Sequence, residues 1–353
     1  MFACHFYVHK LTEPSLPIGG FAMAIITVLL KSLSSHAPSQ ATFWQKVLKL
    51  DLLGAFITIS ATVCLVLALQ WAGSMYPWND SRIIGLFVGS GCLFIILAFV
   101  QVKLGDKGTF PPKVVKNRDI LCAAGFSSMF GAGYYSLVYY LAVYYQSVKG
   151  YSALDAGIRM LPLSISASIS ATGTGALITA LGYYTPFMIV CMALFAAGAG
   201  SLTTLTVSTS YWHGFGFQIL TGLGVGIGFE GGMIVAQKSV PPPSISIAIS
   251  VVSFAMTLGG TIFLSVSQAI FNHGMLRGVA ELAPQVDGQL LLNSGATDIH
   301  TALASMHQEQ YLEYVLRAYA KGTRGVFWLV MACATTAFVA ACGLRWRSLK
   351  KSD

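Results

Sequence analysis

The chain has 353 residues, of which 55% are hydrophobic and only 10% are charged. Soluble domains carry roughly 25% charged residues because a globule needs a polar surface, so this composition excludes an ordinary soluble domain and indicates a membrane protein. The net charge of +8 does not indicate a nucleic-acid partner, because the basic residues lie between apolar runs instead of on a solvated fold.

Apolar runs long enough to form transmembrane helices recur along the chain. A bilayer core of roughly 30 Å needs about 20 apolar residues in a helix. The predicted helices cover residues 15–30, 52–72, 83–102, 119–146, 156–181, 186–207, 214–238, 245–271 and 325–345. We therefore expect an all-α integral membrane protein with about nine transmembrane helices.

The polar stretch 103–118 contains Pro111, Pro112 and five basic residues, and we take it as the main internal boundary. After it come six predicted helices, which is half of a twelve-helix transporter built from two six-helix bundles. The expected order is a leader at 1–14, a three-helix region at 15–118, a complete six-helix bundle at 119–345 with an outer loop at 272–324, and a basic tail at 346–353.

The distribution of Lys and Arg among the loops predicts the orientation. The side that holds 31–51, 103–118, Lys238 and the tail carries more basic residues than the other side. Cytoplasmic loops are enriched in Lys and Arg. We therefore expect a cytoplasmic C-terminus, with 272–324 outside.

Glu230 lies deep in the predicted helix 214–238, within Gly226-Ile-Gly-Phe-Glu-Gly-Gly232. A carboxylate near the bilayer centre costs roughly 2.5–3.5 kcal/mol by insertion measurements. It could couple transport to protons or recognise a cationic substrate. The structural alternative is a protonated Glu that is hydrogen-bonded to a neighbouring helix, and the sequence leaves both open.

Three further polar residues are weaker candidates. Arg159 follows Asp155 by four residues, so the two could form an intrahelical ion pair, or Arg159 could extend to the interface; a structural role is favoured. Gln218 and Gln237 lie on the same predicted helix as Glu230 and could line a pathway, although such residues more often hydrogen-bond neighbouring helices.

Six tyrosines in the predicted helix 119–146 cannot share one helix face. Tyr135 and Tyr139 are one turn apart, as are Tyr140 and Tyr144, and one of these pairs could form an aromatic wall for a substrate. An aromatic belt at the membrane interface is the alternative, and the more favoured one.

Glycines spaced by four residues lie along the predicted helix 214–238. The pattern from Gly226 to Gly231 matches a dinucleotide-binding fingerprint, which we reject because no strand precedes it. Small residues at this spacing instead allow helices to pack closely. The candidate packing residues are Gly222, Gly224, Gly226, Gly228 and Gly232.

Motifs for metal, cofactor or enzymatic chemistry are absent from the sequence. The seven cysteines are scattered without a CxxC or Cys/His ligand pattern, and there is no Walker motif and no Ser/His/Asp or HExxH arrangement. His213, His273, His300 and His307 have no ligand-like spacing. We therefore expect neither an enzyme nor a metal site, and no cofactor.

Several blocks resemble fungal fourteen-helix transporters of the major facilitator superfamily, of the drug:proton antiporter type that includes mycotoxin efflux pumps. The resemblance covers nearly the whole chain from Leu16. The blocks are Asp51-Leu-Leu-Gly54, Leu67-Ala-Leu-Gln-Trp-Ala-Gly73, Tyr76-Pro-Trp78, Ile83-Ile-Gly-Leu86, Tyr139-Tyr-Leu-Ala-Val-Tyr-Tyr-Gln-Ser-Val-Lys-Gly150, Ser152-Ala, Ala156-Gly-Ile-Arg159, Leu161-Pro162 and Gly295-Ala-Thr-Asp298.

This resemblance implies a partial major facilitator fold and efflux of small amphipathic organic compounds, driven by a proton gradient, across the plasma membrane or the vacuolar membrane. The predicted helix 15–30 corresponds to the family's sixth, so 15–118 would hold a remnant of the N-terminal bundle and two linker helices. The family's first five helices would be missing, which suggests a truncated or mis-spliced gene product. The second hypothesis is a non-transporting membrane fragment that associates with full-length transporters.

Overall fold

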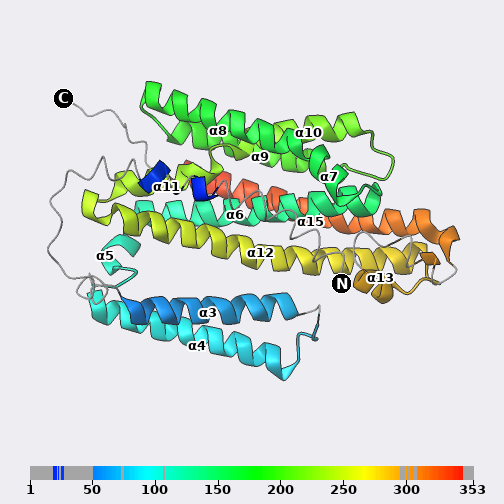
Figure 1. Cartoon of the computed structure of the whole chain (residues 1–353), viewed down its shortest axis with the longest axis horizontal. Coiled ribbons are helices and arrows are strands. Elements are labelled where there is room, and N and C mark those ends of the chain that lie inside the picture. The colour runs from blue at the N-terminus through cyan, green and yellow to red at the C-terminus, as the bar shows by residue number, and fades with distance from the viewer. Residues whose placement is uncertain are drawn as a thin grey trace. The chain divides into compact units, whose positions relative to one another are not determined.

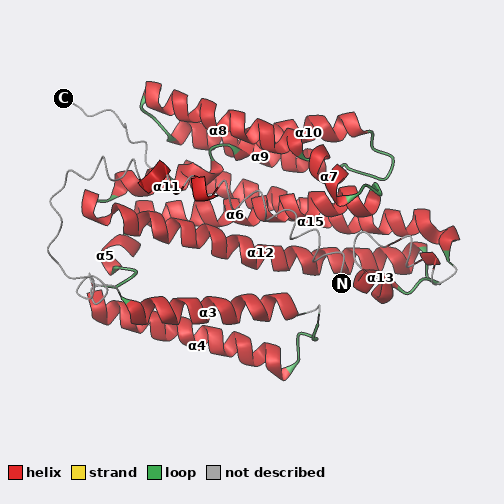
Figure 2. Cartoon of the chain, viewed as in Figure 1, coloured by secondary structure: helices red, strands yellow, loops and turns green. Residues whose placement is uncertain are grey.

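The computed structural model describes residues 19–21, 23, 25–27, 51–72, 75–105, 108–294, 299, 303–304 and 308–344. These residues are helical apart from short connections and one isolated bridge between Ala72 and Tyr76 (Figure 2). The chain divides into two compact units, Met1–Leu50 and Asp51–Asp353. The predicted leader, most of the predicted helix 15–30 and the predicted basic tail lie outside the described residues, although 19–21, 23 and 25–27 are helical.

The second unit begins with a helical hairpin. It consists of α3 (Leu52–Trp71) and α4 (Ser81–Leu104), which pack against each other. Asp51 and Asp80 begin the two helices as N-caps, because each carboxylate accepts a hydrogen bond from a backbone N–H in the first turn. The buried Ser90 hydroxyl joins the two helices by donating to the Ala61 carbonyl (2.9 Å).

Three long helices pack mutually at the centre of the bundle. They are α6 (Arg118–Val143), α12 (Ile245–Leu282) and α15 (Leu312–Cys342), and Figure 1 shows them running alongside one another. The short α5 (Pro112–Val115) precedes α6, and the π-helix η2 (Tyr144–Val148) continues it. The turns η3 (Pro242–Ser244) and η4 (Glu309–Tyr311) precede α12 and α15.

The remaining helices are attached to these three. They are α7 (Ala153–Arg159), α8 (Leu161–Leu181), α9 (Thr185–Leu202), α10 (Tyr211–Val225) and α11 (Gly228–Ser239). Helix α9 packs on α15 and α10, α8 packs on α10, and α11 packs on α6 and α12. The hairpin contacts the bundle through α3 and α12.

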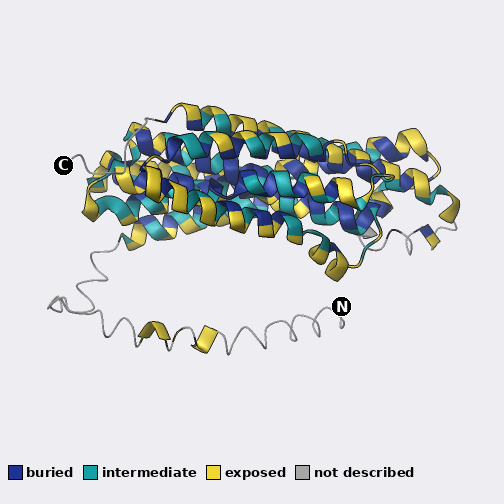
Figure 3. Cartoon of the chain, turned by 90° about the horizontal axis from the view of Figure 1, so that it is seen from above, coloured by how far each residue is buried: buried dark blue, intermediate teal, exposed yellow. Residues whose placement is uncertain are grey.

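Seven described helical segments are long and apolar enough to cross a membrane. Figure 3 shows buried positions inside the bundle and exposed ones around it, and many of the exposed ones on α3 and α4 are large and apolar, such as Phe56 and Ile95. Exposed apolar surface of this extent marks contact with lipid or another protein. The protein is therefore a multi-pass, all-helical membrane protein.

The predicted count of nine spans is not confirmed. One predicted span, 15–30, lies mostly outside the described residues. The other, 119–146, is present as α6 and the start of η2 but is not among the seven. Its many serines, glycines and tyrosines lower its hydropathy.

The predicted outer loop 272–324 is mostly helical. Helix α12 continues to Leu282, α13 occupies Gly288–Ser294, and α15 begins at Leu312. At about 57 Å, α12 is nearly twice as long as a bilayer core is thick. Charged residues end the apolar run at this point but do not end the helix, so hydropathy placed the end of the helix too early.

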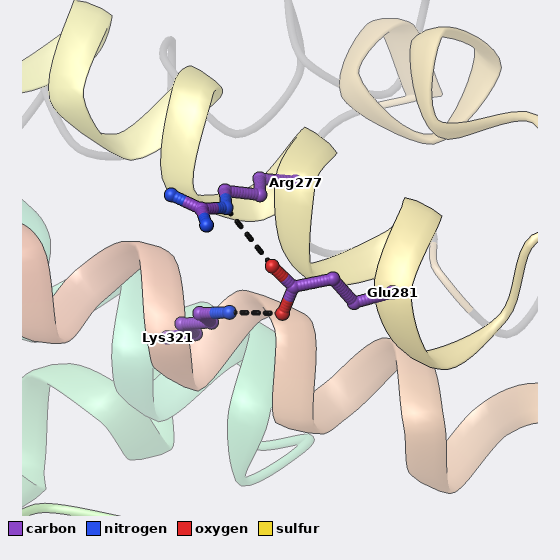
Figure 4. A network of polar contacts seen from close by, with 3 residues as sticks. All are labelled: Arg277, Glu281 and Lys321. Carbon is purple, nitrogen blue, oxygen red and sulfur yellow. Dashed lines mark hydrogen bonds and ion pairs between the residues drawn. The ribbon is translucent and has the colours of Figure 1, made fainter.

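An ion-pair network joins the extended ends of α12 and α15. Glu281 accepts from Arg277 Nε (2.9 Å), one turn earlier on α12, and from Lys321 Nζ of α15 (2.5 Å), as Figure 4 shows. Gly278 lets the two helices approach here, since a Cβ at this position would lie 3.0 Å from the Ala318 Cα.

Asp51 connects both ends of the hairpin. Its carboxylate accepts from the Gly54 N–H (2.7 Å), from Gln101 Nε2 (2.7 Å), and from the N–H and hydroxyl of Thr109 (3.0 Å each). Burial raises the pKa of the Asp51 carboxyl, but these hydrogen bonds outweigh it and hold the pKa below the ordinary value of 3.8.

We expect Asp51→Asn to destabilise the protein by about 1 kcal/mol at pH 7, because a capping carboxylate and its charge-assisted hydrogen bonds are lost. A carboxyl group whose pKa is lower in the folded state stabilises the fold at pH values above its unfolded-state pKa. This stabilisation is lost as the pH falls through the folded-state pKa. The difference in unfolding temperature between Asp51→Asn and wild type, measured in detergent, should therefore shrink below pH 3.8. Asp80→Asn is the control, since among the described residues the Asp80 carboxylate accepts a hydrogen bond from the Arg82 N–H alone (2.8 Å). An equal deficit at pH 7 and well below pH 3.8 would contradict this role.

Candidate functional site

The structure separates the two tyrosine pairs of α6 and η2. Tyr140 and Tyr144 are 2% and 1% exposed, whereas Tyr135 and Tyr139 are 36% and 54% exposed. Tyr140 packs on Phe271 of α12 with ring centroids 5.3 Å apart, and Tyr144 donates to the Thr206 carbonyl (2.8 Å). Of the two pairs, only Tyr135 and Tyr139 are accessible to a substrate.

The open face of α6 is bordered by α11 and α12. On one side, Tyr134 packs edge-on against Phe229 of α11 with centroids 4.8 Å apart, and Phe130 packs against the same ring at 5.1 Å. On the other side, the Tyr135 ring lies against Gly260 of α12, where a Cβ would overlap it. This arrangement forms an aromatic face between two neighbouring helices.

Glu230 directly follows Phe229 and is exposed. It lies in the first turn of α11, where the helix dipole favours a negative charge. Within the described part of the chain, its side chain makes no hydrogen bond or ion pair. The carboxylate is therefore accessible in the first turn of α11, one residue after Phe229, and no described residue supplies the hydrogen bond of the structural alternative.

The two glutamines differ. Gln218 is buried and donates from Nε2 to the Tyr145 hydroxyl (2.8 Å), so it joins α10 to η2. Gln237 is exposed on α11, and its side chain is not part of the contacts around the aromatic face.

Arg159 stacks on aromatic rings. Its guanidinium lies 3.8 Å from the centroid of Tyr151 and 4.7 Å from that of Tyr211. Asp155 does not pair with it in the described structure. Instead, Asp155 accepts from the Ser152 hydroxyl (2.6 Å) at the start of α7. The Arg159 side chain thus fixes the end of α7 against the first residue of α10 by cation–π contacts.

The glycines of α10 and α11 lie where other helices approach. At Gly222, a Cβ would lie 2.5 Å from the Leu163 carbonyl oxygen of α8, and at Gly226 it would lie 2.5 Å from Ser170 of the same helix. At Gly224 it would lie 2.7 Å from the Cys191 carbonyl oxygen of α9. At Gly228 and Gly232 it would overlap the Phe130 ring and the Ser127 hydroxyl of α6.

Two rows of exposed hydroxyl groups, which we call the hydroxyl stripes, were missed by the sequence analysis. One runs along α8 and one along α12, each with spacings of four and seven residues that place its members on one helix face. Several of these hydroxyls, including Thr172, donate to the carbonyl four residues earlier, so their oxygens still have acceptor capacity. The stripes are Ser164, Ser168, Thr172 and Thr179 on α8, and Ser246, Ser250 and Thr257 on α12.

The spacing of these hydroxyl groups was visible in the sequence. What the sequence lacked was evidence that the rows remain exposed after packing. An exposed hydroxyl row gains little from contact with lipid tails, so such rows suit a water-filled pathway or a second helical bundle.

The fold and this surface define a transporter-like bundle of membrane helices. Comparison with known proteins identifies it further, since residues 19–303 match the family described as fungal trichothecene efflux pump (TRI12). The chain belongs to this family, which is one of transporters and not of enzymes. The predicted resemblance to fungal efflux pumps of the major facilitator superfamily is confirmed.

Similar proteins carry efflux or transport names. The chain is 36% identical to the MFS-type efflux pump MFS1 of Arthroderma benhamiae, over 95% of this chain and 62% of that protein. It is 36% identical to the MFS-type transporter astH of Aspergillus oryzae, over 95% and 59%. It is 33% identical to the efflux pump aflT of Aspergillus parasiticus, over 96% and 65%.

The chain thus spans about three fifths of the length of the curated relatives it matches. The hypothesis of a truncated or mis-spliced product that lacks five helices stays a prediction.

We expect Gly222→Ala to destabilise the bundle by about 1–3 kcal/mol, the usual cost of overpacking, because the new methyl group would meet the α8 backbone. Gly216→Ala is the matched control on the same helix, where a Cβ would meet no atom within 4 Å. It should leave stability unchanged or raise it slightly. Thermal unfolding of both variants in detergent tests this, and equal behaviour of the two would contradict the packing role.

Proposed function

We propose that this chain contributes the C-terminal bundle of an efflux transporter for small amphipathic organic compounds, driven by a proton gradient. The observation that carries the proposal is the accessible carboxylate of Glu230, one residue after the Phe229 ring of the aromatic face. Tyr135 and Tyr139 supply ring surfaces for flat or apolar substrates. Glu230 supplies a group that exchanges a proton as access alternates.

The membrane arrangement is part of the proposal. Helix α6 is an eighth span, and its lower hydropathy is tolerated because α11, α12 and α15 cover most of it. The C-terminus is cytoplasmic, following the Lys and Arg distribution. The plasma membrane is the proposed location, with the vacuolar membrane as the alternative.

A second candidate function is association with a longer transporter of the same family. The hydroxyl stripes and the exposed tyrosines favour it, because they form surfaces better suited to a helical partner or to water than to lipid. In that case the chain alone would not export compounds. It would instead co-purify with the longer transporter.

The first test is accumulation of a fluorescent drug in a pump-deficient yeast strain. In the Glu230→Gln variant, we expect export to fall to the level of cells that lack the chain, because the glutamine cannot exchange a proton. Glu309→Gln is the control, as Glu309 is also exposed but lies in η4, outside the aromatic face.

Each outcome of this assay discriminates between the hypotheses. Export that survives Glu230→Gln would contradict proton coupling through this residue. Absence of export by a correctly inserted wild-type chain would contradict autonomous transport and favour the second candidate.

The aromatic wall is tested separately. Tyr139→Ala should raise the half-saturating substrate concentration about two- to tenfold, because a lost aromatic contact is worth roughly 0.5–1.5 kcal/mol. Tyr139→Phe keeps the ring and should behave like wild type in a concentration series of the same assay. An equal effect of both substitutions would assign the role to the hydroxyl group and not to the ring.

A further inference from the structure

A cavity of about 420 Å³ lies where the N-terminal half of α15 faces the connection between α9 and α10. It is separate from the aromatic face of α6. Its polar lining consists of Glu313, Arg317, Lys321 and Arg324 from α15, and Thr206 and Ser208 from the connection.

The basic residues in this cavity are not fully neutralised. Arg317, Lys321 and Arg324 follow one another at spacings of four and three, which places them on one face of α15. Arg317 pairs with Glu313 (2.6 Å), and Lys321 pairs with Glu281 (2.5 Å, Figure 4). Arg324 is exposed and has no ion-pair partner in the described ranges. The cavity therefore keeps a positive charge that no described carboxylate compensates.

The cavity lies at the depth where α15 changes from charged to apolar. Residues 325–342 contain no Asp, Glu, Lys or Arg. Eighteen residues of helix span about 27 Å, close to the thickness of a bilayer core. Arg324 directly precedes this run, so a membrane-spanning α15 would place it at the level of the lipid headgroups.

Hydrogen bonds from η2 and from Lys149, which follows it, hold the α9–α10 connection that forms the opposite wall of the cavity. Lys149 Nζ donates to the Val207 carbonyl (2.7 Å) and to the Thr209 carbonyl (2.6 Å), and the Tyr144 hydroxyl donates to the Thr206 carbonyl (2.8 Å). Burial lowers the pKa of Lys149. These bonds fix the connection so that the Thr206 and Ser208 side chains line the cavity.

We propose that this cavity binds a phosphate group, presented by the headgroup of a membrane phospholipid. A guanidinium donates two parallel hydrogen bonds to phosphate oxygens, and within the described ranges no group accepts a hydrogen bond from the Arg324 side chain. The hydroxyls of Thr206 and Ser208 lie on the facing wall, where they hydrogen-bond each other (3.2 Å). Basic pockets between membrane helices on the cytoplasmic side bind lipid headgroups by the same chemistry, and in the expected orientation this cavity would meet headgroups of the outer leaflet. Free phosphate offers the same groups, and the experiment separates the two sources.

The test is native mass spectrometry of the full chain in detergent, titrated with phosphatidic acid and, in parallel, with diacylglycerol of the same acyl chains. Wild type should retain phosphatidic acid but not diacylglycerol. Arg324→Gln should weaken binding about tenfold, the effect of losing a charge-assisted hydrogen-bond pair. Arg324→Lys should keep most of the binding because it keeps the charge.

Arg277→Gln is the matched control, because Arg277 is an exposed cation of the same network that does not line the cavity. It should change the affinity less than twofold. Displacement of phosphatidic acid by millimolar inorganic phosphate would show that the site takes the free anion as well, and resistance to displacement would assign it to the lipid. Equal binding of the two lipids, or equal weakening by Arg277→Gln and Arg324→Gln, would overturn the proposal.

Discussion

The close contact among α6, α12 and α15 determines where the other helices of the bundle can attach. Lipid tails are as apolar as leucine side chains, so no hydrophobic force brings membrane helices together, and their association depends on packing and interhelical hydrogen bonds. Both are present here. Gly131 of α6 meets the Met256 backbone of α12, and the buried Ser267 hydroxyl donates to that of Ser136 (2.8 Å). Helices α9 and α11 attach to this core directly, whereas α8 packs mainly on α10.

The interruption between α10 and α11 follows from the same constraint. Backbone groups inside a bilayer must find partners within the protein, and a break in a helix frees some of them. Ser170 of α8 donates to the Leu223 carbonyl (2.6 Å), one turn before the break. Gly226 lets α8 come close enough for this bond. The glycine and the serine thus support the break, after which Phe229 and Glu230 lie at the start of a new helix that packs on α6.

Much of the fold could be predicted from the sequence, because apolar runs report helices that face lipid. The hairpin and α9 lie within a few residues of their predicted ranges, whereas the predicted helix 156–181 is divided into α7 and α8, and the predicted helix 214–238 into α10 and α11. The ends of α12 and α15 were placed wrongly, since their charged turns remain helical through mutual packing that hydropathy does not record. For the candidate site, the sequence suggested Glu230 and the tyrosines as candidates but could not say which of the two tyrosine pairs is exposed. That choice depends on Phe271 and Thr206, which are distant in sequence from the tyrosines they contact.

The π-helix η2 links the two regions that carry the proposals. It continues α6 beyond Tyr139, and its Tyr144 and Tyr145 contact the α9–α10 connection and Gln218. The same connection forms a wall of the basic cavity and leads directly into α10. A ligand in the cavity can influence the aromatic face only if it binds one arrangement of these contacts more tightly than another. The contacts provide a continuous physical route for such coupling, and because Lys149 and Tyr144 both end on the connection, any change in its position must break or rearrange their hydrogen bonds.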